Sequence, residues 1–166
     1  MPKDGLIKYY KFLWIGGEHN IYAFVTNDDI SYEVKFVPSS YLFFDYIDDH
    51  VNAFEMVISV VDNPIGKRIP ADPLTEPTIR AIFYDFFRSL DHVIIYICDS
   101  SDGRQEARFR KFTNWYYKNI AVDLFKMDAR LPDGDRFTLL SGILSKKHPH
   151  FSQFVELFKN LAEADK

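Results

Sequence analysis

The first third of the chain contains stretches in which apolar and polar side chains alternate. From residue 30 to residue 36 every second side chain is apolar, and the side chains between them are polar. Successive side chains of a strand point to opposite faces, so this pattern predicts a strand with one buried and one solvated face. Residues 21–26 form another apolar stretch, and the Asn-Asp-Asp sequence at 27–29 favours a turn. We therefore expect a β-hairpin over residues 21–37.

Two further strands are expected beside this hairpin. Residues 8–15 are rich in aromatic and aliphatic side chains and end at a pair of glycines, and residues 54–61 are mostly apolar. The aromatic run at residues 41–46 is ambiguous. Four prolines between residues 62 and 77 predict a connecting loop, because proline lacks the backbone donor that a strand inside a sheet requires.

The middle of the chain predicts a helix, a buried strand and a second helix. Residues 93–98 are apolar without alternation, which is typical of a strand buried on both faces and central in its sheet. The next helix is expected over residues 104–119, where Asp102 and Gln105 have the spacing of a capping box. A helix with Thr75 as its candidate cap precedes the strand, because five apolar residues recur at helical spacing: Ile79, Ile82, Phe83, Phe86 and Leu90.

The end of the chain predicts a hairpin and a last helix. Residues 122–129 and 137–144 have the character of strands, and the Leu-Pro-Asp-Gly-Asp sequence at 131–135 favours a turn between them. Apolar residues at helical spacing predict a helix over residues 150–162.

These elements together predict an α+β fold. We expect a mixed, mainly antiparallel sheet with N-terminal β-hairpins, about three helices covering it, and residues 93–98 as its central strand. The chain has 166 residues, of which 47% are hydrophobic and 17% aromatic. This length and composition fit a single domain over residues 1–166 that can bury a sizeable core.

Charge and cysteine content bear on partners and compartment. The net charge is −4, but residues 1–62 carry ten acidic side chains against four basic ones. An acidic region of this kind could face a basic protein partner. Cys98 is the single cysteine, which favours a reducing compartment, and no apolar run approaches the ~20 residues that a membrane span requires. With no signal peptide in evidence, we expect a cytoplasmic protein without membrane contact.

The polar turn after the central strand is the leading candidate site. Asp99, Ser100, Ser101, Asp102 and Gly103 stand between the strand and the basic helix, where ligands of α/β sheets commonly bind. Backbone N–H groups at the helix start attract anions, whereas the two carboxylates could instead hold Mg²⁺. A turn that only caps the helix is the alternative.

The helix that follows carries a cationic face. At 100° per residue, four basic side chains and one indole fall within about 80° of one another, apart from an apolar stripe that includes Phe112. Guanidinium groups and an aromatic plane suit phosphates and stacked bases, although the basic residues could equally pair with the acidic N-terminal third. This face comprises Arg104, Arg108, Lys111, Trp115 and Lys118.

A second basic pair could join this site. Lys67 and Arg68 lie in the proline-rich loop, and they would approach Arg104 and Arg108 if the strands at 54–61 and 93–98 were parallel neighbours. All four side chains would then surround one ligand-binding pocket.

Three functions remain open. The first is binding of a phosphate-bearing ligand, nucleotide or nucleic acid by the basic helix and the turn before it. The second is a metal-dependent phosphoesterase or nuclease, with Asp99, Asp102 and Arg104 as candidate catalytic residues and Mg²⁺ as the metal. The third is a protein-interaction component of a bacterial toxin–antitoxin, immunity or defence pair. Whether the chain is an enzyme stays open, and outside the second alternative we expect no metal or cofactor.

Two resemblances bear on these alternatives. A strand ending in Asp is similar to haloacid-dehalogenase-like phosphatases, but their second Asp is two residues on, whereas here Asp102 is three residues after Asp99. The sequence DSSDGRQEAR at residues 99–108 resembles the signature of a family of small bacterial proteins of unknown function. This likeness extends from the hairpin at 21–37 to the end, and it implies a bacterial intracellular protein without implying an activity.

Overall fold

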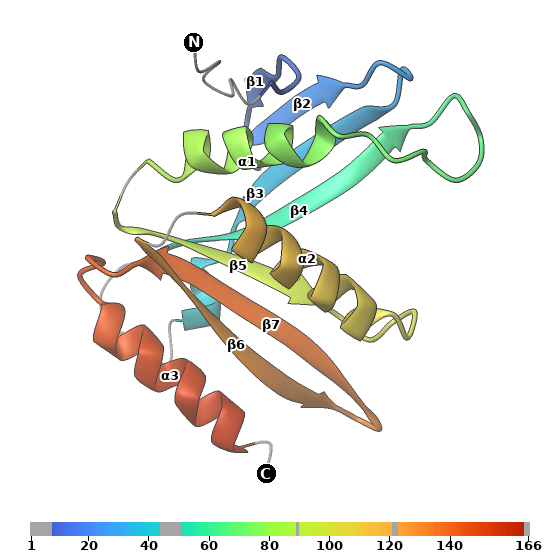
Figure 1. The fold of residues 1–166 in the computed structure, drawn as a ribbon. Coiled ribbons are helices and arrows are strands. Elements are labelled where there is room, and N and C mark those ends of the chain that lie inside the picture. The colour runs from blue at the N-terminus through green and yellow to red at the C-terminus, as the bar shows by residue number, and fades with distance from the viewer. Residues whose placement is uncertain (1–7, 44–50, 89, 121–122, 165–166) are drawn as a thin grey trace.

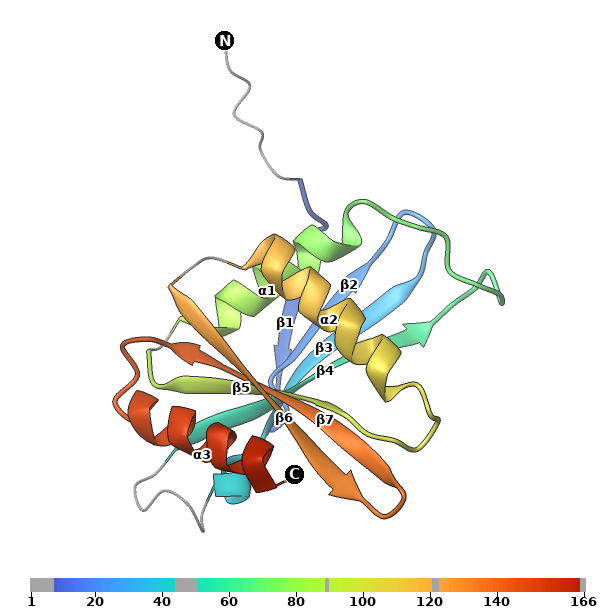
Figure 2. The same cartoon turned by 60° about the horizontal axis from the view of Figure 1, so that its bottom comes forward.

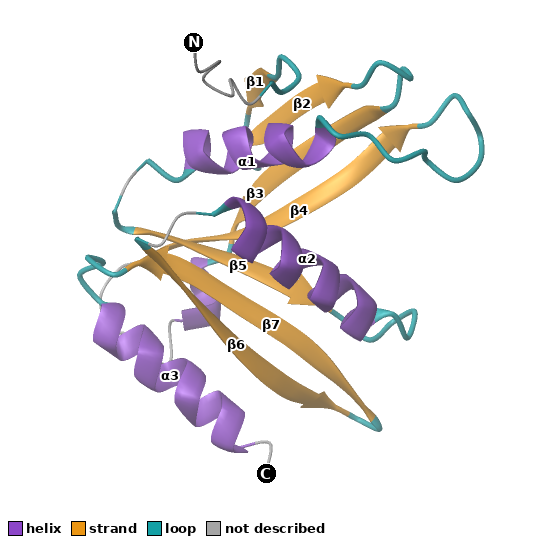
Figure 3. Cartoon of the chain, in the orientation of Figure 1, coloured by secondary structure: helices purple, strands orange, loops and turns teal. Residues whose placement is uncertain are grey.

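The strands of the chain form one seven-stranded mixed sheet, in the order β1-β2-β3-β4-β5-β7-β6 (Figure 1). The computed structural model describes residues 8–43, 51–88, 90–120 and 123–164. The strands are β1 (Leu13–Gly16), β2 (Ile21–Val25), β3 (Ser31–Pro38), β4 (Asn52–Asp62), β5 (His92–Cys98), β6 (Leu124–Asp133) and β7 (Arg136–Ser145). The helices are α1 (Thr75–Phe86), α2 (Gln105–Asn119) and α3 (Phe151–Ala164), with a short 3-10 helix η1 (Ser40–Phe43) (Figure 3). The α+β fold class is confirmed.

β5 lies inside the sheet, as its uninterrupted apolar sequence predicts. It pairs in parallel with β4 and antiparallel with β7. The parallel pairing is short, because it runs only from Asn52↔His92 to Glu55↔Ile95. Beyond Glu55, β4 continues along β3, while β5 continues along β7. The two strands therefore diverge toward their carboxyl ends, as Figure 1 shows.

The two faces of the sheet carry separate cores. On one face, α1 and α2 cover aromatic side chains that include Tyr22, Phe36 and Phe112. On the other face, α3 packs on β5, β6 and β7 through Phe154 and Phe158. Figure 2 shows α3 on the side of the sheet away from α1. No α-helix of the described residues covers most of this second face over β1–β4, and the core under α3 reaches β4 only at its start, at Ala53.

The N-terminal hairpin is confirmed, and the strand before it is shorter than predicted. β2 and β3 pair from Tyr22↔Val34 to Val25↔Ser31. Of the expected strand at 8–15, only the part from Leu13 onward lies in the sheet. The Tyr10 backbone N–H donates to Thr78 Oγ1 at 2.8 Å instead, which ties this segment to α1.

The first helix differs from the prediction at both ends. Thr75 is its first residue rather than its cap, and Leu74 occupies the cap position without a side-chain hydrogen bond. The helix ends at Phe86, so Leu90 is not part of the buried stripe and is 55% exposed. Periodicity extends past the end of a helix when an apolar residue happens to follow at the right spacing.

Three other predicted boundaries also change. No capping box forms at α2, because Arg104 is the cap residue and the Gln105 side chain donates to Phe137 O at 3.2 Å. The hairpin turn is tighter than residues 131–135, since β6 and β7 remain paired out to Asp133↔Arg136. The ambiguous run at 41–46 begins in η1, and its remainder lies outside the described residues.

Candidate functional site

The turn after β5 is closed by its own side chains. Asp99 Oδ1 accepts hydrogen bonds from Ser101 N at 3.0 Å and Ser101 Oγ at 2.6 Å. Asp102 Oδ1 accepts from Arg104 N at 3.0 Å. Gly103 has a φ of 70°, which favours glycine at this point of the turn. Both carboxylates therefore stabilise the turn itself, and neither caps α2, whose cap residue Arg104 has no side-chain cap bond.

Arg108 lies across this turn and bonds to it. Its Nη1 donates to Asp102 Oδ2 at 2.6 Å, and its Nη2 donates to the Asp99 carbonyl oxygen at 2.8 Å. The Asp99 carboxylate lies 3.8 Å from the same Nη2. The Arg108 guanidinium holds the pKa of Asp102 below its usual range, and the Ser101 hydroxyl does the same for Asp99. An anion that bound the Arg108 Nη1 would have to displace Asp102.

The turn is also tied to the β6–β7 hairpin. Arg136 Nη1 donates to the Ser100 carbonyl oxygen at 2.7 Å, and Gln105 Nε2 bonds to the β7 backbone. Gln105 Oε1 is buried without a hydrogen-bond partner among the described residues. Beneath the turn, burial raises the pKa of the Cys98 thiol. The cysteine thus behaves as a small core residue rather than as a reactive thiol.

Trp115 is in the core, so the prediction that it belongs to the cationic face of α2 is wrong. Its ring packs against Phe83 and Phe112, with centroids 5.9 and 5.7 Å away. Its Nε1–H donates to the Glu76 carbonyl oxygen at 3.5 Å, and the residue is only 8% exposed. The indole contacts α1 and is not available to stack on a base.

The remaining basic residues do not converge on one site. Lys118 pairs with Glu76 at 3.3 Å, whereas Arg104 and Lys111 are exposed and form no ion pair within the described residues. Lys67 and Arg68 are exposed in the loop after β4. Figures 1 and 2 both separate this loop from the turn after β5.

β4 and β5 are parallel neighbours, which was the condition for the second basic pair to join the site, yet this pairing does not bring the two basic pairs together. β4 runs on to Asp62 after its last contact with β5 at Glu55, and it carries the loop away with it. The predicted ring of four cations is therefore not formed.

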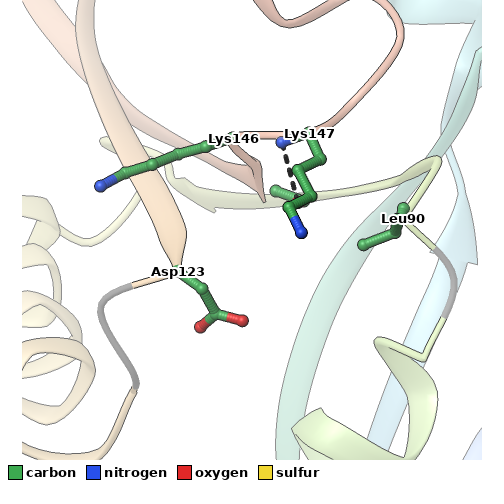
Figure 4. Close-up of a pocket in the computed structure, with 5 residues that line it drawn as sticks. Leu90, Asp123, Lys146 and Lys147 are labelled. Carbon is green, nitrogen blue, oxygen red and sulfur yellow. Dashed lines mark hydrogen bonds between the residues drawn. The ribbon is translucent and has the colours of Figure 1, made fainter.

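Two hollows of the described surface have no residue of the turn in their walls. One, of about 450 Å³, is lined by Glu18, His19, Val37 and Pro38. The other, of about 270 Å³, has Leu90, Asp123 and two lysines at its wall. In Figure 4 the Lys146 and Lys147 ammonium groups point in different directions, so they do not define an anion site. No group of three potential metal ligands occurs among the described residues.

The sheet has an unguarded edge at β1 that the sequence analysis did not single out. Leu13, Trp14 and Ile15 are 62%, 56% and 57% exposed. We call these three residues the β1 edge. Isolated exposed apolar residues are ordinary, but three in succession on a terminal strand make the β1 edge a candidate interaction surface. The signal in the sequence was an apolar run without polar alternation, placed just before two glycines.

The β1 edge continues into a sheet face without a helix over it. Leu13 pairs with Ala23, and Ala23 pairs with Glu33, so these three side chains share one cross-strand row. Val25 points to the same face, because Tyr22 and Phe24 point into the core beneath α1. Lys35 pairs with Glu33 on this face at 3.6 Å. We call the side of β1–β4 opposite α1 the open face.

The chain is an α+β protein whose mixed sheet has one face only partly covered by helices. Comparison with known proteins places the chain in a family. Residues 71–160 match a family of unknown function (DUF6169), and the chain belongs to that family. The expected membership is confirmed, although the match begins after β4 and not at the hairpin. β1–β4 thus precede the matched residues. No curated protein and no solved structure matches the chain.

Membrane insertion through a helix has no support in the described residues. None of their helices combines the length and the apolar character that crossing a bilayer requires.

Proposed function

We propose that the chain is a protein-interaction component of a bacterial two-protein pair, of the toxin–antitoxin, immunity or defence kind. The observation that carries the proposal is the β1 edge, with Leu13, Trp14 and Ile15 each more than half exposed. Contiguous apolar residues at a sheet edge are costly in a free protein, because they promote aggregation unless a partner covers them.

The charge of the surrounding region supports a basic partner. Residues 8–43 and 51–62 carry six carboxylates and three lysines, and one of those lysines, Lys35, is paired with Glu33. Complementary charge speeds association and disfavours wrong partners. The proposal includes a cytoplasmic location, which the single buried Cys98 supports.

The contacts of α2 make phosphate binding the weaker proposal. The cationic face has lost Trp115 to the core, and Arg108 is bonded to Asp102. Binding of nucleotides or nucleic acids by Arg104 and Lys111 stays a prediction. It requires an affinity that falls steeply with salt, since neutralising phosphates releases counterions.

Site-specific photo-crosslinking in the native host tests the proposal. The photoreactive residue p-benzoylphenylalanine replaces Leu13 in one variant and Glu156, an exposed residue of α3, in a matched control. We expect the Leu13 variant to give one defined protein adduct that the Glu156 variant does not give. The same products from both positions, or adducts with nucleic acid alone, would overturn the proposal.

A further inference from the structure

The two edges of the sheet differ in how they are protected, and this difference indicates how the partner binds. We propose that the β1 edge takes up an extended, cationic segment of the partner protein as an additional strand of the sheet. This inference rests on the proposed function and specifies the binding mode and the chemistry of the partner.

The opposite edge of the sheet, β6, carries the devices that prevent strand addition. Lys126 Nζ bonds to Asp128 Oδ1 at 2.6 Å, although the Lys126 side chain is only 1% exposed. The same ammonium lies 4.9 Å from the Phe109 ring centroid and 5.8 Å from that of Tyr117, so α2 extends over this edge. Charged side chains on a terminal strand and elements that cover it block pairing with another chain.

β1 carries no charged side chain, and only its short length and one bulge limit pairing there. Its sequence is Leu-Trp-Ile-Gly, without a charge or a proline, and it pairs only with β2 among the described residues. A terminal strand presents unpaired N–H and C=O groups along its outer side. A bulge lies between Trp14 and Gly16, so the free edge consists of Leu13 to Ile15. An extended segment could bond to this backbone and place its side chains beside the exposed residues of β1.

The acidic charge around the β1 edge favours a cationic segment as the added strand. Glu18 is exposed in the turn that follows β1, and carboxylates outnumber lysines two to one in the described part of β1–β4 and its loops. A second copy of the chain would bring the same acidic excess to the contact. A segment that alternates basic and apolar side chains would meet the carboxylates and the apolar edge together.

Trp14 provides a direct optical probe, because Trp115, the other tryptophan, is already buried. The probe ligand is an end-capped peptide of eight residues in which valine and lysine alternate. One control peptide replaces lysine with glutamate. A second control keeps the valine–lysine sequence but carries an N-methyl group on every second residue, which removes backbone donors while retaining every side chain.

We expect the valine–lysine peptide to shift Trp14 emission to shorter wavelength in a saturable titration. Both control peptides should bind at least tenfold more weakly. The Ile15→Lys variant should bind the valine–lysine peptide more weakly than the wild type does, by a similar factor. Equal binding of the N-methylated peptide would overturn strand addition, and equal binding of the glutamate peptide would overturn the cationic preference.

Two further outcomes separate this inference from the proposed function. If the valine–lysine peptide does not bind but crosslinking at position 13 captures a partner, the protein-interaction function stands and strand addition is wrong. If sedimentation shows a dimer that Ile15→Lys dissociates, the edge belongs to a second copy of the chain, and the cationic partner is ruled out.

Discussion

The Arg108 guanidinium donates a 2.6 Å hydrogen bond to the Asp102 carboxylate, within the turn where a ligand was expected. This contact holds the turn at residues 99–103 against α2, the most basic helix of the chain, and we call it the Arg108–Asp102 clasp. The candidate surface then shifts from α2 to β1, where Leu13, Trp14 and Ile15 are each more than half exposed.

The clasp can be tested by titration of Asp102. The bond from Arg108 lowers the pKa of Asp102, so Arg108→Ala should raise it toward the ordinary value of about 3.9. Carboxyl chemical shifts followed by NMR between pH 6 and pH 2 measure the change. Lys111→Ala removes an exposed charge of the same helix and serves as control. An Asp102 pKa that is the same in wild type and Arg108→Ala would show that the clasp does not persist in solution.

The two tryptophans should respond oppositely to truncation. Trp115 is buried against Phe83, so we expect Trp115→Ala to lower the free energy of unfolding by about 3–5 kcal/mol. Trp14 is 56% exposed, and Trp14→Ala should change it by about 1 kcal/mol or less. Urea denaturation monitored by circular dichroism compares the variants. If Trp115→Ala changed the free energy of unfolding only slightly, the ring would lie on the surface, where it could stack on a base.

Helix periodicity alone could not have assigned Trp115 correctly. The angle along α2 puts it within the cationic stripe, and its burial depends on a neighbour far away in sequence. α1 packs beside α2, and Glu76 accepts the indole N–H bond. In contrast, the interior position of β5 was predictable because its side chains are apolar without interruption, a purely local property.

The edge strand illustrates a second limit of sequence reasoning. Residues 8–12 have the same aromatic character as β1, yet Tyr10 bonds to Thr78 and Asp72 rather than entering the sheet. Which part of such a segment joins the sheet depends on the partners that α1 and its preceding loop offer. The hairpins, by contrast, follow from local turn sequences and alternation.

Gly142 provides a test of the packing between β7 and α3. A Cβ atom at this position would lie 2.6 Å from Phe158 Cζ, which is closer than such contacts allow. We expect Gly142→Ala to destabilise the protein by about 1–3 kcal/mol in thermal or urea denaturation. The double variant Gly142→Ala/Phe158→Leu should recover part of this loss. Full stability of Gly142→Ala alone would mean that α3 does not pack on Gly142 as described.

His148 should make the stability of the fold depend on pH. Its Nδ1 accepts a bond from the His150 backbone N–H at 2.9 Å, and its Nε2 donates to the Asp91 carbonyl at 3.0 Å. Burial lowers the pKa of His148, so the folded state prefers the neutral ring. Below about pH 6.5 the unfolded state binds a proton more readily than the folded state, and stability falls as the pH decreases toward the folded pKa.

Denaturation midpoints from pH 7.5 to pH 5.5 test this dependence. His148→Gln should flatten the decline, whereas the exposed His19→Gln should preserve it. An identical decline in wild type and His148→Gln would assign the pH dependence to another group.

The central claim is that Leu13 to Ile15 form the recognition edge of the protein, and amide hydrogen exchange of these residues tests it most directly. We predict that those of the Leu13–Ile15 amides that point away from β2 exchange rapidly in the free protein and at least tenfold more slowly with saturating valine–lysine peptide, while the amides bonded to β2 and those of β6 keep their rates. Unchanged exchange at all three positions in the presence of bound peptide would contradict the account.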